Sequence, residues 1–300
     1  MYVIRFGKLR VIEFADPLEF ELHTQRWLAI REAENAYLYM MLADIKHAAA
    51  GGARGAGAAR LFTIEDNGAI VAAGALPAAD TLCMTWATEA MIDVLADHAV
   101  QKGWNLRTIY SPEPVSRLMA RALAARCGLA LEIGRGERVY QLAQVGYRLP
   151  EGRLEAATPA DLQLLRGWTN HYAAEVAMER TAPEIESALD AIVATNALFL
   201  WRRPEVVAMA AWIAPTPQGG CVSWVYVPPE RRGKGYGKAV SGALCAHMLA
   251  SGLKYCFIHT DTHDARSNHI YQAIGATTVC ELLRCSLRPS REAGRQMAGV

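Results

Sequence analysis

One segment of the chain, residues 225–238, constrains the fold more than any other. It reads Val-Tyr-Val-Pro-Pro-Glu-Arg-Arg-Gly-Lys-Gly-Tyr-Gly-Lys, an apolar strand-like run followed by two prolines and a basic, glycine-rich turn. Proline cannot donate to a β-ladder, so Pro228 and Pro229 end the strand. An apolar stripe at Val240, Leu244 and Met248 predicts a helix from about residue 236 to 250. The sequence therefore predicts a strand, a tight turn and a helix in close succession.

The turn has the chemistry of a phosphate site. Its three glycines let the backbone turn tightly and approach a ligand without obstruction by Cβ atoms. The first N–H groups of the following helix point into the turn, and the helix dipole favours an anion there. We interpret the turn as a pyrophosphate site, surrounded by four cationic side chains: Arg231, Arg232, Lys234 and Lys238.

Two common nucleotide motifs do not fit this turn. A P-loop needs four residues between its glycines and a Lys-Ser/Thr pair after them, whereas three residues separate Gly233 from Gly237 and Ala239 takes the hydroxyl position. The dinucleotide fingerprint needs a glycine where this chain has Lys238. These mismatches disfavour a nucleotide-phosphate enzyme.

Residues 232–237, Arg-Gly-Lys-Gly-Tyr-Gly, fit the pattern R-x-x-G-x-G and resemble the coenzyme A pyrophosphate loop of the GNAT superfamily of N-acyltransferases. A second segment, residues 266–276, is similar to the later motif of that family, an Asn on a helix followed by Tyr and a glycine-ended turn. The resemblance implies that Asn268 bonds the coenzyme arm and that Tyr271 protonates the departing thiolate.

The resemblance also implies the reaction, which is direct attack of an amine on the thioester of acetyl-CoA without a metal. A backbone N–H near Val227 is expected to polarise the thioester carbonyl. The expected acetyl-CoA contacts are Val225, Val227, Arg231, Arg232, Gly233, Lys234, Gly235, Tyr236, Gly237, Lys238, Asn268 and Tyr271.

The general base is not defined by the motifs, because the strand Cys221–Val227 carries no acid. A carboxylate, a histidine or a water chain must take a proton from the amine before it attacks. Cys221 is not assigned as an acyl-accepting nucleophile because no activating partner is identifiable. His259 and His263 straddle a strand end and lack the helical spacing of a zinc pair. The candidate bases are His171, Glu175, Glu179, His259 and Asp261.

The chain reads as two halves, with a boundary at residues 147–153, where Pro150 and Gly152 interrupt two strand-like runs. Both halves show the order helix, helix, hairpin, strand, helix, strand, helix, strand. In the first half, Asn67-Gly68 predicts a hairpin turn, and the Ala/Gly tract of residues 48–59 predicts a flexible loop. The final segments are expected as strand-like runs at 129–133 and 138–145, and as a strand pair ending near Leu287.

The first half lacks the coenzyme loop. Its strand-to-helix junction, residues 86–89, reads Trp-Ala-Thr-Glu without glycine or arginine. Residues 54–59 also satisfy R-x-x-G-x-(G/A), but they follow a helix and precede a strand, so no helix N-terminus faces them. The expected fold is mixed α/β, with two tandem GNAT-like folds, each a mostly antiparallel sheet flanked by helices. We place a degenerate domain at residues 1–148 and the acetyl-CoA-binding domain at residues 149–300.

Composition sets the remaining expectations. The net charge is +1, which gives no reason to expect a nucleic-acid or membrane partner. No apolar stretch reaches the ~18 residues of a spanning helix, and charges at Arg5, Lys8 and Arg10 exclude a signal peptide. Seven cysteines without a C-x-x-C pair indicate reduced thiols in the cytoplasm.

Two functions remain from the sequence. The first is an N-acetyltransferase acting on a primary amine of a small molecule or a protein. The second is a non-catalytic acyl-CoA-binding or sensing module, since the strand before the turn lacks an acid.

Overall fold

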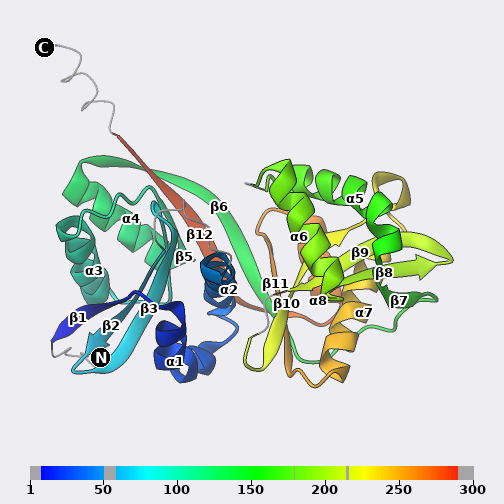
Figure 1. Cartoon of the computed structure of the whole chain (residues 1–300), viewed down its shortest axis with the longest axis horizontal. Coiled ribbons are helices and arrows are strands. Elements are labelled where there is room, and N and C mark those ends of the chain that lie inside the picture. Colours follow the sequence, from blue (N-terminus) through cyan, green and yellow to red (C-terminus); the bar gives the residue numbers. More distant parts are fainter. Residues whose placement is uncertain (1–7, 51–58, 179, 214–215, 290–300) are drawn as a thin grey trace, which may run out of the picture. The chain divides into compact units, whose positions relative to one another are not determined.

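The computed structural model describes residues 8–50, 59–178, 180–213 and 216–289 (Figure 1). Contacts group the chain into two compact units. Unit 1 comprises the residues up to Arg138, Asp261–His263 and the residues from Cys280 on, and unit 2 comprises Val139–Thr260 and Asp264–Val279. Two long strands, β6 (Leu129–Leu142) and β12 (Thr277–Pro289), contribute residues to both units.

The observed strands correct two sequence expectations. The two strand-like runs at 129–133 and 138–145 are one strand, and the expected last strand pair is also one strand. Glycines inside β6 mark close backbone approach rather than a turn, since a Cβ on Gly134 would lie 2.9 Å from the Arg284 carbonyl oxygen. The predicted boundary at residue 148 therefore differs from the contact division, which also places the C-terminal strand from Cys280 on in unit 1.

Unit 1 is a mostly antiparallel sheet with the strand order β1-β2-β3-β4-β5-β12, in which the β4–β5 pair is parallel. The hairpin at Asn67 and Gly68 is confirmed, with φ angles of 51° and 84° in the left-handed region. The tract at 48–59 lies largely outside the described residues, as does most of the look-alike motif at 54–59, but the first part of the tract continues a helix to Ala50. The elements are β1 (Leu9–Phe14), α1 (Pro17–Leu28), η1 (Ala29–Arg31), α2 (Ala36–Ala50), β2 (Arg60–Asp66), β3 (Ala69–Ala78), β4 (Thr81–Met84), α3 (Glu89–Gln101), β5 (Thr108–Pro112) and α4 (Glu113–Cys127).

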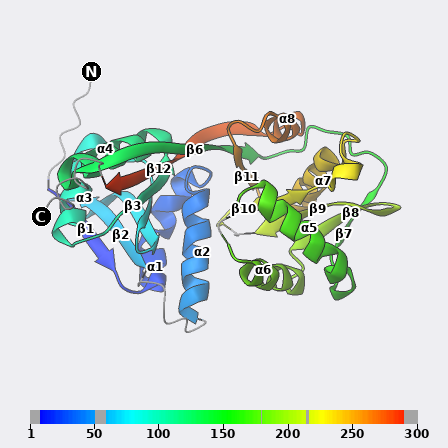
Figure 2. The ribbon, with the colours of Figure 1, turned by 90° about the horizontal axis from the view of Figure 1, so that it is seen from above.

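In unit 2 the strand order is β7-β8-β9-β10-β11, and the pairs are antiparallel except for β10–β11, which is parallel. Helices α5 and α6 cover one face and α7 the other (Figure 2). The elements are β7 (Arg153–Ala156), η2 (Pro159–Asp161), α5 (Leu162–Glu175), α6 (Ala182–Ala194), β8 (Leu198–Arg203), β9 (Glu205–Ile213), β10 (Gly219–Tyr226), η3 (Pro229–Arg231), α7 (Tyr236–Ala250), β11 (Tyr255–Asp261) and α8 (Ala265–Ala273).

The core of unit 2 follows the two-residue period of its strands. On β8, Phe199 and Trp201 pack in the cluster of α7, whereas Leu198 and Leu200 pack in the cluster of α5 and α6. Since β8 is apolar on both faces, the sheet is covered by helices on both sides. The predicted fold class, two mostly antiparallel sheets flanked by helices, is confirmed.

The end of β10 departs from regular pairing, and this departure prepares the site. The parallel register with β11 covers Gly219–Val222, and the register with β9 shifts between Ser223 and Tyr226. Trp224 within this shift has a φ of 51°, which is unusual for a bulky residue. The last residues of β10 therefore continue beyond the β11 pairing as a bulged strand end.

At the start of α5, the hydrogen bonds of the Asp161 carboxylate predict that the stability of the fold depends on pH. The Asp161 carboxylate accepts bonds from the Thr158 backbone N–H at 2.9 Å, the Thr158 hydroxyl at 2.8 Å and Arg202 Nη2 at 2.9 Å. Partial burial raises the pKa of Asp161, but these three donors outweigh it and bring the pKa below the ordinary value. A lowered folded-state pKa adds stability above the ordinary pKa of 3.8, and this stability is lost as the pH falls through the folded-state value.

We therefore expect Asp161→Ala to reduce the free energy of unfolding by about 1 kcal/mol at pH 7. The difference from wild type should shrink at pH 3, below the ordinary pKa of 3.8, because the unfolded chain there takes up the proton and the ionised folded state loses part of this stability. Urea unfolding at the two pH values measures both differences. An equal loss at both values would contradict a charge-dependent role for Asp161.

Within the described residues, no helix is both long and apolar enough to cross a bilayer. The same residues contain no group of three or more His, Cys, Asp or Glu side chains able to hold a metal ion.

Candidate functional site

A cavity of about 490 Å³ lies in unit 2 where the end of β10, the glycine-rich turn and α8 meet. It brings together residues that are far apart in the sequence, from both predicted motifs. Nine of the predicted acetyl-CoA contacts line it, together with the candidate base Glu175: Val225, Val227, Arg232, Gly233, Gly235, Tyr236, Gly237, Lys238 and Tyr271. Sequence reasoning had assigned no binding role to a further set of lining residues: Tyr226, Asp264, Arg266, Ser267, His269 and Ile270.

The backbone of the turn is built to present N–H groups. Gly233 and Gly235 have φ angles of 78° and 80°, which a residue with a Cβ rarely adopts, and Gly235 is the N-cap of α7. The first bond of the helix runs from the Ala239 N–H to the Gly235 carbonyl at 3.0 Å. The N–H groups in the first turn of an α-helix have no partner within the helix, and the dipole adds positive potential there. This end of the cavity therefore favours an anion such as a phosphate.

The cations around the turn divide into two groups. Arg232 and Lys238 line the cavity, and the Lys238 ammonium lies 4.4 Å from the centre of the Tyr147 ring. Arg231 instead forms an ion pair with Glu205, and neither it nor Lys234 is among the described residues that line the cavity. The predicted contacts of Arg231 and Lys234 with the coenzyme stay predictions.

An ion pair between Arg232 of the turn and Glu175 of α5 lies at the wall of the cavity. Arg232 Nη2 lies 2.6 Å and 2.8 Å from the two Glu175 carboxylate oxygens, and Arg232 Nε donates to the Val227 carbonyl at 2.8 Å. The guanidinium also lies 5.7 Å from the centre of the Tyr226 ring. Burial and, next, the charge of Glu175 raise the pKa of Tyr226 above its ordinary value. No local sequence pattern predicts the pair, because its partners come from separate elements.

Tyr271 is a buried tyrosine that lines the cavity. It lies on α8, is 7% exposed and lines the cavity. Burial is the main reason that its pKa lies well above the ordinary tyrosine value, with a smaller contribution from Tyr172. The hydroxyl therefore keeps its proton at neutral pH and can give it to a stronger base that forms beside it.

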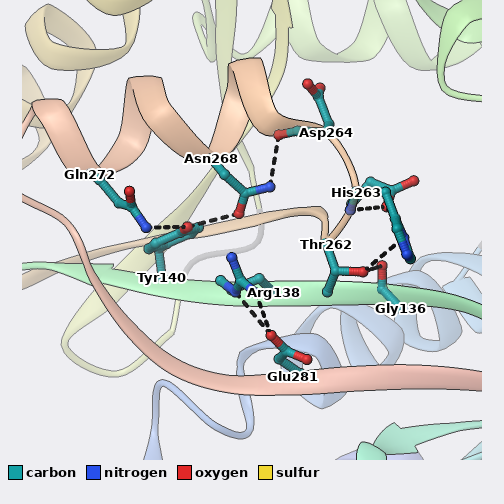
Figure 3. A network of polar contacts seen from close by, with 10 residues as sticks. Gly136, Arg138, Tyr140, Thr262, His263, Asp264, Asn268, Gln272 and Glu281 are labelled. Carbon is teal, nitrogen blue, oxygen red and sulfur yellow. Dashed lines mark hydrogen bonds and ion pairs between the residues drawn. The ribbon is translucent and has the colours of Figure 1, made fainter.

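Asn268 forms hydrogen bonds within unit 2. Its Oδ1 accepts from the Tyr140 hydroxyl at 2.8 Å, and its Nδ2 donates to the Asp264 carbonyl at 2.8 Å (Figure 3). Gln272 Nε2 also donates to the Tyr140 hydroxyl at 3.3 Å. Asn268 is not among the described residues that line the cavity. In this arrangement it joins α8 to β6, and its contact with the coenzyme arm stays a prediction.

The candidate bases are separated by the structure. Glu175 lines the cavity, whereas His171, His259 and Asp261 are not among its described lining residues. Partial burial raises the pKa of Asp261, but bonds from the His263 backbone N–H and from Arg135 bring it below the ordinary value. Glu179 lies outside the described residues.

At the corresponding strand end in unit 1, side chains bond the backbone of Met84, the last residue of β4. Its N–H donates to the Ser111 hydroxyl at 3.0 Å, and its carbonyl accepts from the fully buried Tyr37 hydroxyl. Both backbone groups of Met84 are therefore already hydrogen-bonded. A cavity of about 280 Å³ lies next to this strand end, and Thr85 and Trp86 line it.

The hydrogen bond from the Tyr37 hydroxyl to the Met84 carbonyl predicts a loss of stability in the variant Tyr37→Phe. The substitution leaves the buried Met84 carbonyl without its hydroxyl donor, so we expect a loss of about 1–3 kcal/mol in unfolding free energy. Denaturant titration measures the loss. A variant as stable as wild type would contradict a structural role for this hydrogen bond.

Comparison with known proteins gives one family match and several solved structures. Residues 199–284 match the family described as FR47-like protein, and this match contains both motifs. No curated protein matches the sequence.

Several solved structures align with residues of both units. A GNAT-family acetyltransferase from Colwellia psychrerythraea aligns over 94% of this chain and 99% of its own, with 12% identity and a TM-score of 0.58. A GCN5-related N-acetyltransferase from Sphaerobacter thermophilus aligns over 93% and 96%, with 16% identity and a TM-score of 0.57. A tandem GNAT protein of the clavulanic acid biosynthesis pathway aligns over 93% and 98%, with 13% identity and a TM-score of 0.51.

Proposed function

We propose, from the tandem GNAT fold of this chain, that it is an acetyl-CoA-dependent N-acetyltransferase whose site lies in unit 2. The observation that carries the proposal is one cavity that joins an open helix N-terminus to a buried tyrosine proton donor. The residues present fit the coenzyme, because the turn offers backbone donors and cations for a pyrophosphate. Acetyl-CoA bound there would supply an acetyl thioester to an amine acceptor.

Each part of the cavity has a separate task in this proposal. The N–H groups of Tyr236, Gly237 and Lys238 bind phosphate oxygens, and Arg232 and Lys238 add charge. The strand end at Val227 supplies a backbone donor for the developing oxyanion. Tyr271 donates its proton to the departing thiolate sulfur.

The acceptor must lose a proton before or during attack. Among the described candidate bases, Glu175 is the one that lines the cavity, so we propose it as the base, directly or through water. Arg232 contacts both oxygens of the Glu175 carboxylate, so a proton-accepting role for Glu175 requires that this ion pair separate.

The remaining parts of the proposal concern unit 1 and the cellular setting. Unit 1 is a degenerate copy without a coenzyme site, supported by the absence of glycine and arginine from residues 86–89 and by the hydrogen bonds on both backbone groups of Met84. The acceptor is a primary amine of a small molecule or a protein. All seven cysteines are free thiols, which supports a reducing, cytoplasmic setting.

Calorimetric titration with acetyl-CoA, with ATP and NADH as controls, tests the proposal. Saturable micromolar binding of acetyl-CoA alone is expected, and no binding would contradict it. The alternative of a non-catalytic acyl-CoA-binding module draws on the absence of an acid from residues 221–227. Release of free thiol in the presence of a panel of primary amines distinguishes an enzyme from that module.

A further inference from the structure

In the proposed coenzyme site, the carboxylate of Glu175 already pairs with Arg232. Arg232 belongs to the turn that would hold the pyrophosphate, yet a carboxylate from α5 already occupies it with both oxygens. Both side chains line the same cavity. An incoming phosphate and Glu175 are therefore two anions competing for one guanidinium.

The Arg232–Glu175 ion pair is sufficiently exposed to solvent for another anion to replace Glu175. The side chains of Arg232 and Glu175 are 30% and 46% exposed, and ion pairs with this much solvent contact are weak. A pyrophosphate carries more negative charge than one carboxylate and forms strong charge-assisted bonds with arginine. A ligand without phosphate does not need Arg232 and can bind while the pair stays intact.

We infer that Glu175 is an affinity-determining residue that competes with the donor's pyrophosphate for Arg232, so that it weakens the binding of acyl donors that carry phosphate and holds Arg232 until such a donor displaces it. The inference rests on the proposed function. The same competition determines when Glu175 can act as a base, because the carboxylate would be released toward the cavity when the donor binds. The coenzyme would then bind before the carboxylate becomes available to an amine.

A competing interpretation makes the opposite prediction. If the pair mainly braces the site, through the bond from Arg232 Nε to the Val227 carbonyl, then its loss should weaken the binding of every donor. The sign of the change in affinity therefore distinguishes competition from bracing.

The test is calorimetric titration of the full-length Glu175→Gln variant with two probes, acetyl-CoA and S-acetylpantetheine, which lacks the phosphates. Since exposed ion pairs contribute at most about 1 kcal/mol, we expect acetyl-CoA to bind about two- to fivefold more tightly than to wild type. Binding of S-acetylpantetheine should not change. Unchanged or weaker acetyl-CoA binding would overturn the inference, as would equal tightening of both probes, which indicates simple unblocking of the cavity.

Two further variants complete the test. Asp190→Asn breaks an exposed pair with Arg166 in the same unit, outside the described cavity lining and the predicted coenzyme contacts, and should leave both affinities unchanged. In an Arg232→Gln background, Glu175→Gln should no longer tighten acetyl-CoA binding, because the competed cation is absent. If wild type itself binds no acetyl-CoA, the proposed function fails. If wild type binds but Glu175→Gln shows no gain, the competition alone fails.

Discussion

Replacing Tyr271 with Phe is expected to lower kcat by about 10²-fold or more, because a positioned general acid contributes about 10²–10⁴-fold to a proton-transfer step. The ring remains and fills the same buried position, so acetyl-CoA should bind with an affinity within about twofold of wild type. Steady-state thiol release measures kcat, and calorimetry measures binding. Because burial raises the Tyr271 pKa above the ordinary value of 10.0, the wild-type rate should not fall through loss of this proton as the pH approaches 10.

The matched control is Tyr236→Phe. Tyr236 also lines the cavity, but its proposed contribution is the backbone N–H at the start of α7, which the substitution preserves. It should change kcat by less than about threefold if only the Tyr271 hydroxyl acts as the acid. Equal kcat for Tyr271→Phe and wild type would show that another group protonates the thiolate.

Gly237→Glu is expected to weaken acetyl-CoA binding by at least about 100-fold, since like charges in close contact cost several kcal/mol at an interface. Gly237 lies in the first turn of α7 and lines the cavity. A Cβ there would lie 3.2 Å from Ile270 Cδ1 and 3.7 Å from Val227 Cγ2. The larger side chain is therefore expected to place a carboxylate where the phosphates are proposed to bind, and calorimetry measures the loss.

Gly167→Glu provides the control for charge and helix propensity. Gly167 is an exposed helical glycine of α5 in the same unit, and a Cβ there would meet no atom within 4 Å. This variant should bind acetyl-CoA as wild type does. Circular dichroism of both variants checks that α-helical content is retained. Wild-type affinity in folded Gly237→Glu would remove the turn from the proposed site.

Local patterns predicted the part of the site that depends on neighbours in the sequence. The prolines, glycines and apolar stripe around residues 225–250 define the strand, turn and helix, and the structure has β10 and α7 at these places. Tyr271 was predicted from the motif at residues 266–276, and it lines the cavity with the turn. These features follow from backbone conformation and helix ends, which a few adjacent residues determine.

Features that depend on distant partners were not predicted. Glu175 was one of several candidate bases, and its pairing with Arg232 requires α5 to lie beside the turn. Asn268 was expected as a coenzyme ligand from the motif, and its bond from the Tyr140 hydroxyl of β6 was not predicted. The strand-like runs at 129–133 and 138–145 were predicted separately, although they belong to one strand that lies close to β12. In each case the deciding contact lies far away in the sequence.

Hydrogen exchange of backbone amides, with and without acetyl-CoA, tests the central claim most directly. If the turn and the first turn of α7 bind the pyrophosphate, exchange should slow within residues 225–240 on addition of acetyl-CoA. The strand-to-helix junction of unit 1, residues 84–92, should exchange at the same rate in both conditions. Protection at residues 84–92 without protection at 225–240 would contradict the assignment of the site to unit 2.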